Sequence, residues 1–257
     1  MVRKKKVGFL SIADVWFDTA AFTDNKSAIA ALHTNHVIDK EEYDFRLDAK
    51  TFLLDISGEK EDIFAKFEYK SARYAINKAL KDGVQVYKVS SEQELEQYME
   101  FQREFCKKKK IPVLNQEELK ELKSYYALSK DGEYLGACAF IESSDKKTVR
   151  YKYGATLHKL NANEAILWHV ICEYHDKGFQ YFDFGGCIPT EDKSSYYYRH
   201  YHFKKKFGGE LIDSYTYFKV RGIYKILYFC FIFVVKLFFK GDINGFTNWL
   251  SEKKILK

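Results

Sequence analysis

The stretch from Asn161 to Tyr217 constrains the fold more than any other part of the chain. Residues 162–176 predict a helix, because Asn161 is a good N-cap, Glu164 lies three residues later as in a capping box, and Gly178 can end the helix. The helical residues are apolar around most of the circumference. This pattern indicates a helix that is buried on several sides.

Two glycine pairs separate the elements that follow. Residues 181–184 predict a short strand that stops at Gly185-Gly186, a polar loop leads to an aromatic and basic segment at 196–207, and Gly208-Gly209 opens a last strand at 211–218. Aromatic and β-branched residues favour the two strands. The glycines permit a positive φ or a close backbone approach at the strand ends.

The upstream residues predict an α/β (α+β) fold. Alternation and turn signals favour strands at 51–56, 84–89, 125–129, 134–141 and 149–154, and apolar spacing favours helices at 59–80, 91–108 and 117–123. In the helix at 59–80, Ile63, Phe67 and Tyr74 form the expected apolar stripe. Residues 9–16 fit either a strand or a short helix. This order predicts a mixed central sheet with helices on both faces.

Composition and charge narrow the class of protein. The 257 residues are 46% hydrophobic, which is enough for a core, and a net charge of +6 suits an anionic partner such as phosphate, nucleic acid or an acidic membrane. Five cysteines without a C-x-x-C pair indicate a reducing, cytoplasmic compartment. His33 and His36 are three residues apart, so a strand would point them to opposite sides, and we expect no metal site.

Two motifs resemble a known family. The segment D-F-G-G, ending at Gly186, and the segment F-K-x-x-F-G-G, starting at Phe203, occur in the order found in GNAT-superfamily acyltransferases of the FemAB-like branch. That branch includes peptidoglycan-bridge aminoacyltransferases and enzymes of surface-polysaccharide synthesis. A weaker match covers residues 73–86, which resemble the basic helix and following strand of the family. The resemblance implies a GNAT-like sheet and an acyltransferase.

The resemblance also suggests site residues. It places Lys204 at the family's lysine, where a cation would stabilise an oxyanion, although residues 204–206 also fit a solvated basic loop. Asp183 could accept a proton, but organising the turn is the favoured role. Tyr153 would flank the donor, and His200 or His202 could act as a base. The expected catalytic residues are Lys204, Tyr153 and Asp183, and the expected substrate-binding residues are Arg73, Lys78, Gly185, Gly186, Phe203 and His202.

The donor and acceptor are less sharply defined. Acetyl-CoA-dependent members usually carry R/Q-x-x-G-x-G/A before the donor helix, and this chain has only Gly154 there. The resemblance therefore implies aminoacyl-tRNA or acetyl-CoA as donor. The acceptor would be an amine, or less readily a hydroxyl, of a cell-envelope glycan or its lipid-linked precursor. The alternative is a non-catalytic GNAT-fold binding module at the membrane surface.

The expected domain organisation has three parts. Residues 1–90 would form an N-terminal GNAT-like part, residues 91–220 the acyltransferase core, and residues 221–257 a membrane-prone tail. In the tail, residues 223–239 are apolar apart from Lys225 and Lys236, which lie near one line on a helix. An in-plane helix on the cytoplasmic face of the cell membrane is favoured, and a spanning helix or a helix docked on protein are the alternatives.

Overall fold

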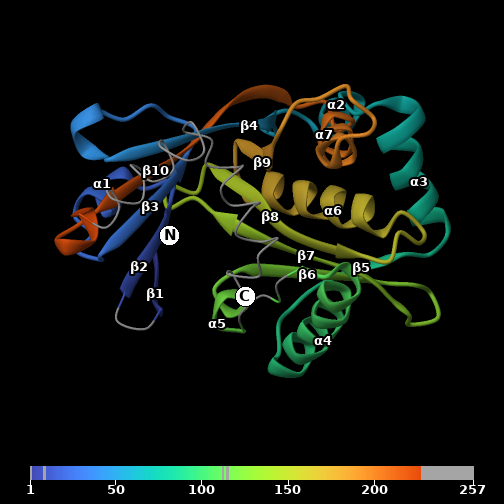
Figure 1. The fold of residues 1–257 in the computed structure, drawn as a ribbon. Coiled ribbons are helices and arrows are strands. Elements are labelled where there is room, and N and C mark those ends of the chain that lie inside the picture. The colour runs from blue at the N-terminus through green and yellow to red at the C-terminus, as the bar shows by residue number, and fades with distance from the viewer. Residues whose placement is uncertain (1, 8–9, 112, 114–115, 227–257) are drawn as a thin grey trace. The chain divides into compact units, whose positions relative to one another are not determined.

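The computed structural model describes residues 2–7, 10–111, 113 and 116–226 (Figure 1). They form two compact units. The larger unit is Asp48–Tyr215, and the smaller contains Val2–Leu47 and the chain from Thr216. Strands β4 (Phe45–Asp55) and β10 (Glu210–Val220) contribute residues to both. The predicted boundary at residues 90 and 91 falls inside the larger unit, between a strand and a helix that both belong to it.

The larger unit contains a mixed sheet in the order β10-β4-β9-β8-β7-β6-β5. Neighbouring strands from β5 to β8 are antiparallel, as are β4 and β9, whereas β8 and β9 are parallel. The remaining strands are β5 (Gln85–Lys88), β6 (Lys123–Leu128), β7 (Tyr134–Glu142), β8 (Thr148–Thr156) and β9 (Tyr181–Cys187). The predicted mixed sheet is confirmed.

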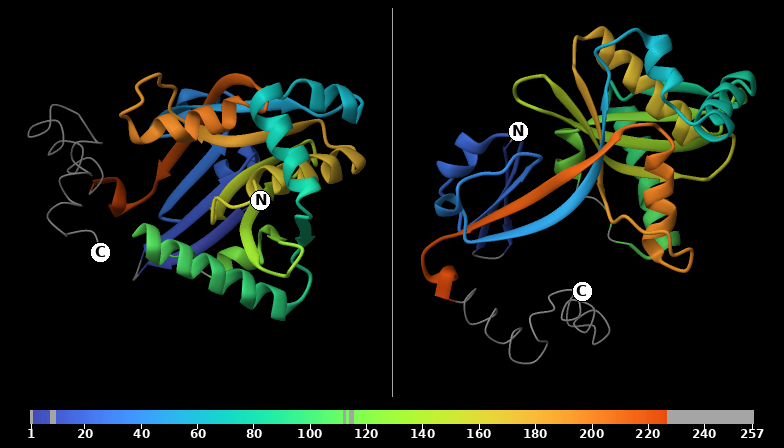
Figure 2. Two further views of the ribbon diagram at one scale, coloured as in Figure 1. Left: turned by 90° about the vertical axis from the view of Figure 1, so that its right-hand side faces the viewer. Right: turned by 90° about the horizontal axis from the view of Figure 1, so that it is seen from above.

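Helices cover both faces of this sheet, as Figures 1 and 2 show. Helix α6 contacts β6, β7 and β8, while α4 contacts β7 and β8 from the other face. The central residues of β7 are therefore buried on both sides. The helical elements of the unit are α2 (Lys60–Ala65), η2 (Tyr69–Arg73, a π-helix), α3 (Tyr74–Lys81), α4 (Glu92–Lys109), α5 (Gln116–Lys120), α6 (Ala162–Asp176) and α7 (Tyr196–Lys205).

Two local predictions differ from the structure. The helix expected at 59–80 is interrupted at residues 66–68, where the N–H of Glu68 donates to the carbonyl of Lys206. The π-helix that follows turns Tyr74 outward, so this residue is 63% exposed and does not belong to the apolar stripe of Ile63 and Phe67. The capping box expected at Asn161 is also wrong, because its side chain makes no cap bond and Glu164 pairs with Lys206.

The aromatic and basic segment after the polar loop is a helix. Ser195 caps α7 by accepting the N–H of Tyr197. The ring of Phe207, just beyond the helix, stacks on Phe184 of β9 with 5.1 Å between centroids. Phe67 meets the same ring edge-on at 5.3 Å. The end of α7 is thereby fixed on the core of the larger unit.

The smaller unit has its own strands. Strands β1 (Val2–Val7) and β2 (Leu10–Trp16) are antiparallel, β2 and β3 (Ile29–Thr34) are parallel, and α1 (Thr19–Thr23) and η1 (Lys40–Glu42) complete the unit. His33 stacks on Trp16, and its Nδ1 lies 3.1 Å from the Thr216 hydroxyl. No described group of His, Cys, Asp and Glu side chains could hold a metal ion.

The predicted C-terminal tail lies almost entirely outside the described residues, which end at residue 226. Within the part of the chain that the structure describes, no helix combines the length and apolar character needed to cross a membrane.

Candidate functional site

The two parallel strands of the larger unit pair over only three residues each. Thr148–Arg150 of β8 lie opposite Tyr181–Asp183 of β9, and the ladder stops there although β8 continues to Thr156 and β9 to Cys187. The last pair of this ladder is Arg150 and Asp183. A site between two such strands is where a GNAT-like fold is expected to accept its donor.

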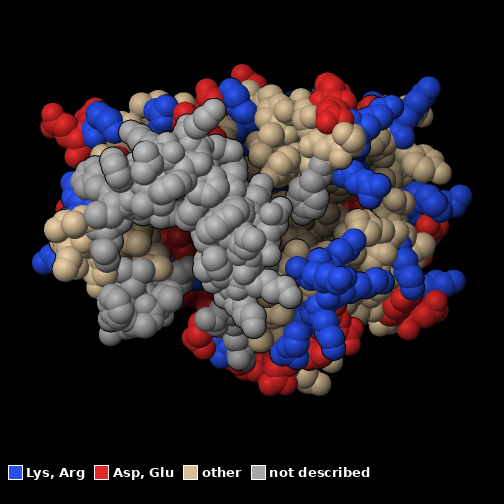
Figure 3. Space-filling model, viewed as in Figure 1, with Lys and Arg blue, Asp and Glu red and all other residues tan. Residues whose placement is uncertain are grey.

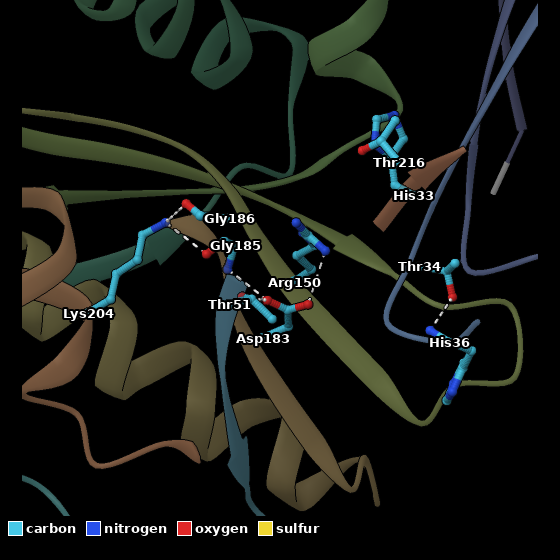
Figure 4. A network of polar contacts seen from close by, with 10 residues as sticks. All are labelled: His33, Thr34, His36, Thr51, Arg150, Asp183, Gly185, Gly186, Lys204 and Thr216. Atoms are coloured by element: carbon cyan, nitrogen blue, oxygen red, sulfur yellow. Dashed lines mark hydrogen bonds and ion pairs between the residues drawn. The ribbon is translucent and has the colours of Figure 1, made fainter. Parts of the chain in front are cut away.

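Asp183 forms a buried polar network at this point (Figure 4). Its carboxylate is fully buried and accepts the Thr51 hydroxyl at 2.5 Å, the Gly185 N–H at 2.7 Å and the Arg150 Nη1 at 3.1 Å. The Arg150 side chain is 10% exposed. A buried carboxylate needs a cation and hydrogen bonds of this kind to remain charged. Asp183 thus connects β4, β8 and the turn in β9.

Gly185 adopts a conformation that other residues rarely tolerate. Its φ is 76°, and a Cβ atom there would lie 2.6 Å from the carbonyl oxygen of Tyr151. The glycine therefore allows β9 to turn close beside β8. The turn aims two consecutive carbonyl oxygens, those of Gly185 and Gly186, at the same side chain.

That side chain is Lys204 of α7. Its Nζ donates to the Gly185 oxygen at 2.9 Å and to the Gly186 oxygen at 2.7 Å, as Figure 4 shows. Burial lowers the pKa of Lys204 to about 8; the positive charge of Arg150 also lowers it, whereas Cys187 and Asp183 raise it. At pH 7 the amine is mostly protonated. The two carbonyls occupy two N–H groups of the ammonium, and no other described residue accepts the third.

The two histidines of α7 differ in position. His200 precedes Lys204 by four residues and so shares its face of the helix. Burial and the charge of Lys204 lower the pKa of His200. His202 points elsewhere, with its Nε2 3.3 Å from the Glu191 carboxylate. The structure thus distinguishes the two candidate bases, and His200 is the one near Lys204.

The other predicted residues of α7, Phe203 and His202, lie on other faces of the helix than Lys204. Phe203 packs against the core, and its ring centroid lies 5.6 Å from that of Phe207. His202 lines a cavity of about 350 Å³ together with Lys66, Glu68, Lys205, Lys206 and Gly208. The cationic groups of this cavity are largely engaged, since Lys206 pairs with Glu164 and Lys205 pairs with Glu191.

Tyr153 lies on β8 beyond the end of the parallel ladder. Its hydroxyl donates to Glu118 at 2.6 Å, and the Nζ of Lys152 lies 3.0 Å from the same carboxylate. No described hydrogen bond joins Tyr153 to Lys204. Tyr153 remains a candidate for substrate contact through its place on β8.

Arg73 and Lys78 are not part of the Lys204 network. The Arg73 guanidinium lies 4.9 Å from the centroid of the Tyr69 ring, and Lys78 pairs with Asp82 at 2.9 Å. On the face shown in Figure 3, basic side chains gather where Figure 1 has α4, and acidic side chains lie directly beside them.

The structure brings together Lys204, Asp183, Gly185 and Gly186, but no described contact links Arg73 or Lys78 to them.

The sequence analysis missed Arg150 and Thr51. Arginine in a strand between Val149 and Tyr151 is a signal that could have been used, because a charged residue in a buried strand needs a partner. Thr51 gives no such signal, since threonine is an ordinary strand residue.

The fold of the chain matches solved structures of other proteins. FemX superposes with a TM-score of 0.63 at 13% identity, covering 88% of this chain and 85% of its own. L-PGS from Bacillus licheniformis gives 0.58 at 13% identity, covering 93% and 86%. The chain has the GNAT-type fold of FemX. The C-terminal domain of a putative lysylphosphatidylglycerol synthetase from Agrobacterium fabrum also matches, at 0.54 and 13% identity, covering 91% of this chain and 85% of its own.

The predicted fold is thereby confirmed at the level of three-dimensional structure. Neither a protein-family model nor a curated protein matches the sequence. The TM-scores establish a shared fold, whereas the identities are too low to transfer chemistry, so the residues themselves must carry any argument about it.

Proposed function

We propose that the chain is an acyltransferase that moves an aminoacyl or acetyl group to an amine or hydroxyl of a cell-envelope glycan or its lipid-linked precursor. The observation that carries this proposal is the ammonium of Lys204, held by two carbonyl oxygens with its third N–H left for a reacting oxygen. The position next to the diverging strands β8 and β9 supports it.

The chemistry follows from that arrangement. The acceptor nitrogen or oxygen attacks the carbonyl carbon of the donor, and the electron pair of the C=O bond moves to the oxygen. Lys204 stabilises this oxyanion. When the intermediate collapses, the C=O bond re-forms, the bond to the leaving group breaks, and the proton of the acceptor passes to the leaving group. We assign the relay of that proton to His200, which lies one helical turn from Lys204 and would accept the proton and then deliver it to the leaving group; its lowered pKa keeps it neutral at pH 7.

An aminoacyl donor is favoured over acetyl-CoA. The name lysylphosphatidylglycerol synthetase describes attachment of a lysyl group to a lipid, and the C-terminal domain of a putative protein of that name shares this fold. The turn before α6 provides no glycine-rich backbone for a pyrophosphate. Gly154, the one glycine in this part of the chain, makes room for the Tyr151 side chain, because a Cβ atom there would lie 1.7 Å from the Tyr151 hydroxyl oxygen. Aminoacyl-tRNA is therefore the donor that we propose first.

A comparison of donors tests this proposal. The full chain would be given acetyl-CoA or a mixture of aminoacyl-tRNAs carrying radiolabelled acyl groups, with lipid-linked glycan precursors as acceptors. We expect label transfer from aminoacyl-tRNA, with binding that weakens as salt increases because phosphate contacts are lost. Transfer from acetyl-CoA alone would reverse the donor assignment. Absence of transfer from every donor would favour the non-catalytic binding module.

The pH dependence of turnover gives a second prediction. Because the pKa of Lys204 is about 8, the ammonium is present below that pH and is lost as the pH rises through it. We therefore expect kcat/KM to fall on the alkaline side with an apparent pKa near 8, because kcat/KM reports the titration of the free enzyme. Lys204→Arg keeps its charge at all these pH values, so any activity left in that variant should lack the alkaline fall. An alkaline limb retained by Lys204→Arg would assign the titration to another group.

A further inference from the structure

The ion pair at the end of the β8–β9 ladder is coupled to Lys204 through a single turn. Asp183 accepts the N–H of Gly185, and the carbonyl of the same glycine accepts the ammonium of Lys204. The N–H of Gly185 and the hydroxyl of Thr51 both donate to Oδ1 of Asp183, and Nη1 of Arg150 donates to Oδ2 at 3.1 Å. Any movement of Asp183 would therefore move the carbonyl that binds Lys204.

The network is rigid as well as connected. Asp183 is fully buried, and Arg150 is nearly so, which makes the pair costly to break because a charge would be left without its partner. The close approach of Gly185 to the Tyr151 carbonyl leaves the turn no space to shift toward β8. Three strands, β4, β8 and β9, each contribute one side chain to hold it.

We propose that Arg150 and Asp183 are positioning residues for Lys204: they fix the Gly185 turn that binds the ammonium, and their two charges set the electrostatic potential at its nitrogen. This inference rests on the catalytic role proposed for Lys204. It adds two residues that would act through Lys204 without contact to the substrate.

Among the described residues, the titratable groups around Lys204 lie on β8, β9 and α7. Arg150 of β8 lowers the pKa of Lys204, while Asp183 and Cys187 of β9 raise it. His200 lies on α7 with Lys204, and its lowered pKa keeps it neutral above pH 7. Burial raises the pKa of the Cys187 thiol. Arg150 and Asp183 thus act on the pKa of Lys204 in opposite directions.

Because Arg150 and Asp183 shift the pKa of Lys204 in opposite directions, their removal provides a test that differs from general damage to the fold, which would not be expected to give shifts of opposite sign. The pKa of Lys204 would be measured in the full chain, without substrate, by NMR of ¹³C-labelled lysine, with the signal assigned by its loss in Lys204→Met. Arg150→Met removes a positive charge and should raise the pKa of Lys204. Asp183→Asn removes a negative charge and should lower it. Each shift should be about half a unit to one unit, as expected for a unit charge several ångströms away in a partly screened site.

Thr51→Val is the matched control, because it removes a hydrogen bond to Asp183 but no charge. It should leave the pKa of Lys204 within about 0.2 units of the wild-type value, which is less than half of the shift expected from one nearby charge. If Arg150→Met fails to fold, the same step is made in the Asp183→Asn background, where no buried carboxylate is left unpaired. The added Arg150→Met change should then raise the pKa again.

Two results would overturn the inference. One is a shift of the same sign in Arg150→Met and Asp183→Asn, and the other is no shift in either. Because the titration needs no substrate, it stands apart from the outcome of the donor experiment. A protein without transferase activity could still show the opposite shifts, and an active one could lack them. Where activity is found, both variants should change kcat more than KM, since neither residue contacts the substrate.

Discussion

Replacing Lys204 by methionine is expected to lower kcat about 10²–10³-fold, the size of effect seen when one donor to an oxyanion is removed from an enzyme. Methionine fills a similar volume but cannot donate to the oxygen of the tetrahedral intermediate. KM should change little, because the third N–H of Lys204 is proposed to act on the charge that develops during the reaction and not on the bound donor. Steady-state kinetics with the best donor would measure both constants.

Lys205→Met is the matched control for this experiment. Lys205 is the next residue on the same helix, is about half exposed and pairs with the exposed Glu191. Exposed pairs of this kind contribute little, so kcat should stay within about threefold of the wild type. A Lys204→Met variant that also keeps kcat within that range would remove Lys204 from the mechanism.

The stability of Lys204→Met separates a catalytic loss from a folding loss. The pKa of Lys204 is lower in the folded protein than in the unfolded chain, so the unfolded state binds more protons between pH 8 and 10.5. The buried ammonium therefore destabilises the fold below pH 8, and this cost is relieved as the pH rises toward 10.5. Removing the amine relieves this cost of up to about 3 kcal/mol but leaves the carbonyls of Gly185 and Gly186 without their donor, so the free energy of unfolding at pH 7 should change little.

Signals that are local in sequence predicted much of the larger unit. The helix at 162–176 has the predicted bounds, and the helix predicted at 91–108 is α4, Glu92–Lys109. Such features depend on residues within one or two turns of each other. The aromatic and basic segment at 196–205 was harder, because its aromatic side chains show no helical period and only Ser195 marks the start.

The contacts that sequence reasoning missed are non-local. Thr51 and Asp183 are 132 residues apart, and Arg150 and Asp183 are 33 apart. Their meeting depends on the order of β4, β9 and β8 in the sheet and on the register of each pair. A one-residue change of register would turn these side chains to the opposite face. The motif identified Lys204 and the glycines, but only the structure shows that a buried ion pair holds them.

The break at residues 66–68 has the same kind of cause. The sequence there favours a continuous helix. In the structure, however, the backbone of Lys66 packs against Gly208 so closely that a Cβ atom on residue 208 would lie 2.1 Å from the Lys66 carbonyl oxygen. The N–H of Glu68 is also taken by the carbonyl of Lys206. The close packing of two distant segments, made possible by Gly208, replaces the helical hydrogen bonds and exposes Tyr74.

Gly208→Ala is accordingly expected to destabilise the protein by about 3–5 kcal/mol, in the range reserved for severe backbone conflicts. The φ of Gly208 is 71°, which costs an alanine about 1–2 kcal/mol. The added methyl would also overlap the carbonyl oxygen and carbon of Lys66, at 2.1 and 2.7 Å. Both atoms are backbone, so neither can move without separating α2 from the end of α7. Urea unfolding, followed by tryptophan fluorescence, would measure the loss.

Gly132→Ala distinguishes the two contributions. Gly132 has a φ of 83° in the turn between β6 and β7, and a Cβ atom there would meet nothing within 4 Å. Gly132→Ala should therefore lower the free energy of unfolding only by the cost of an alanine at positive φ, about 1–2 kcal/mol. The difference between the two variants therefore measures the close approach of Lys66 to Gly208. Equal losses would show that the backbone relaxes around the methyl group, and the end of α7 would then be less firmly fixed than the placement of Lys204 requires.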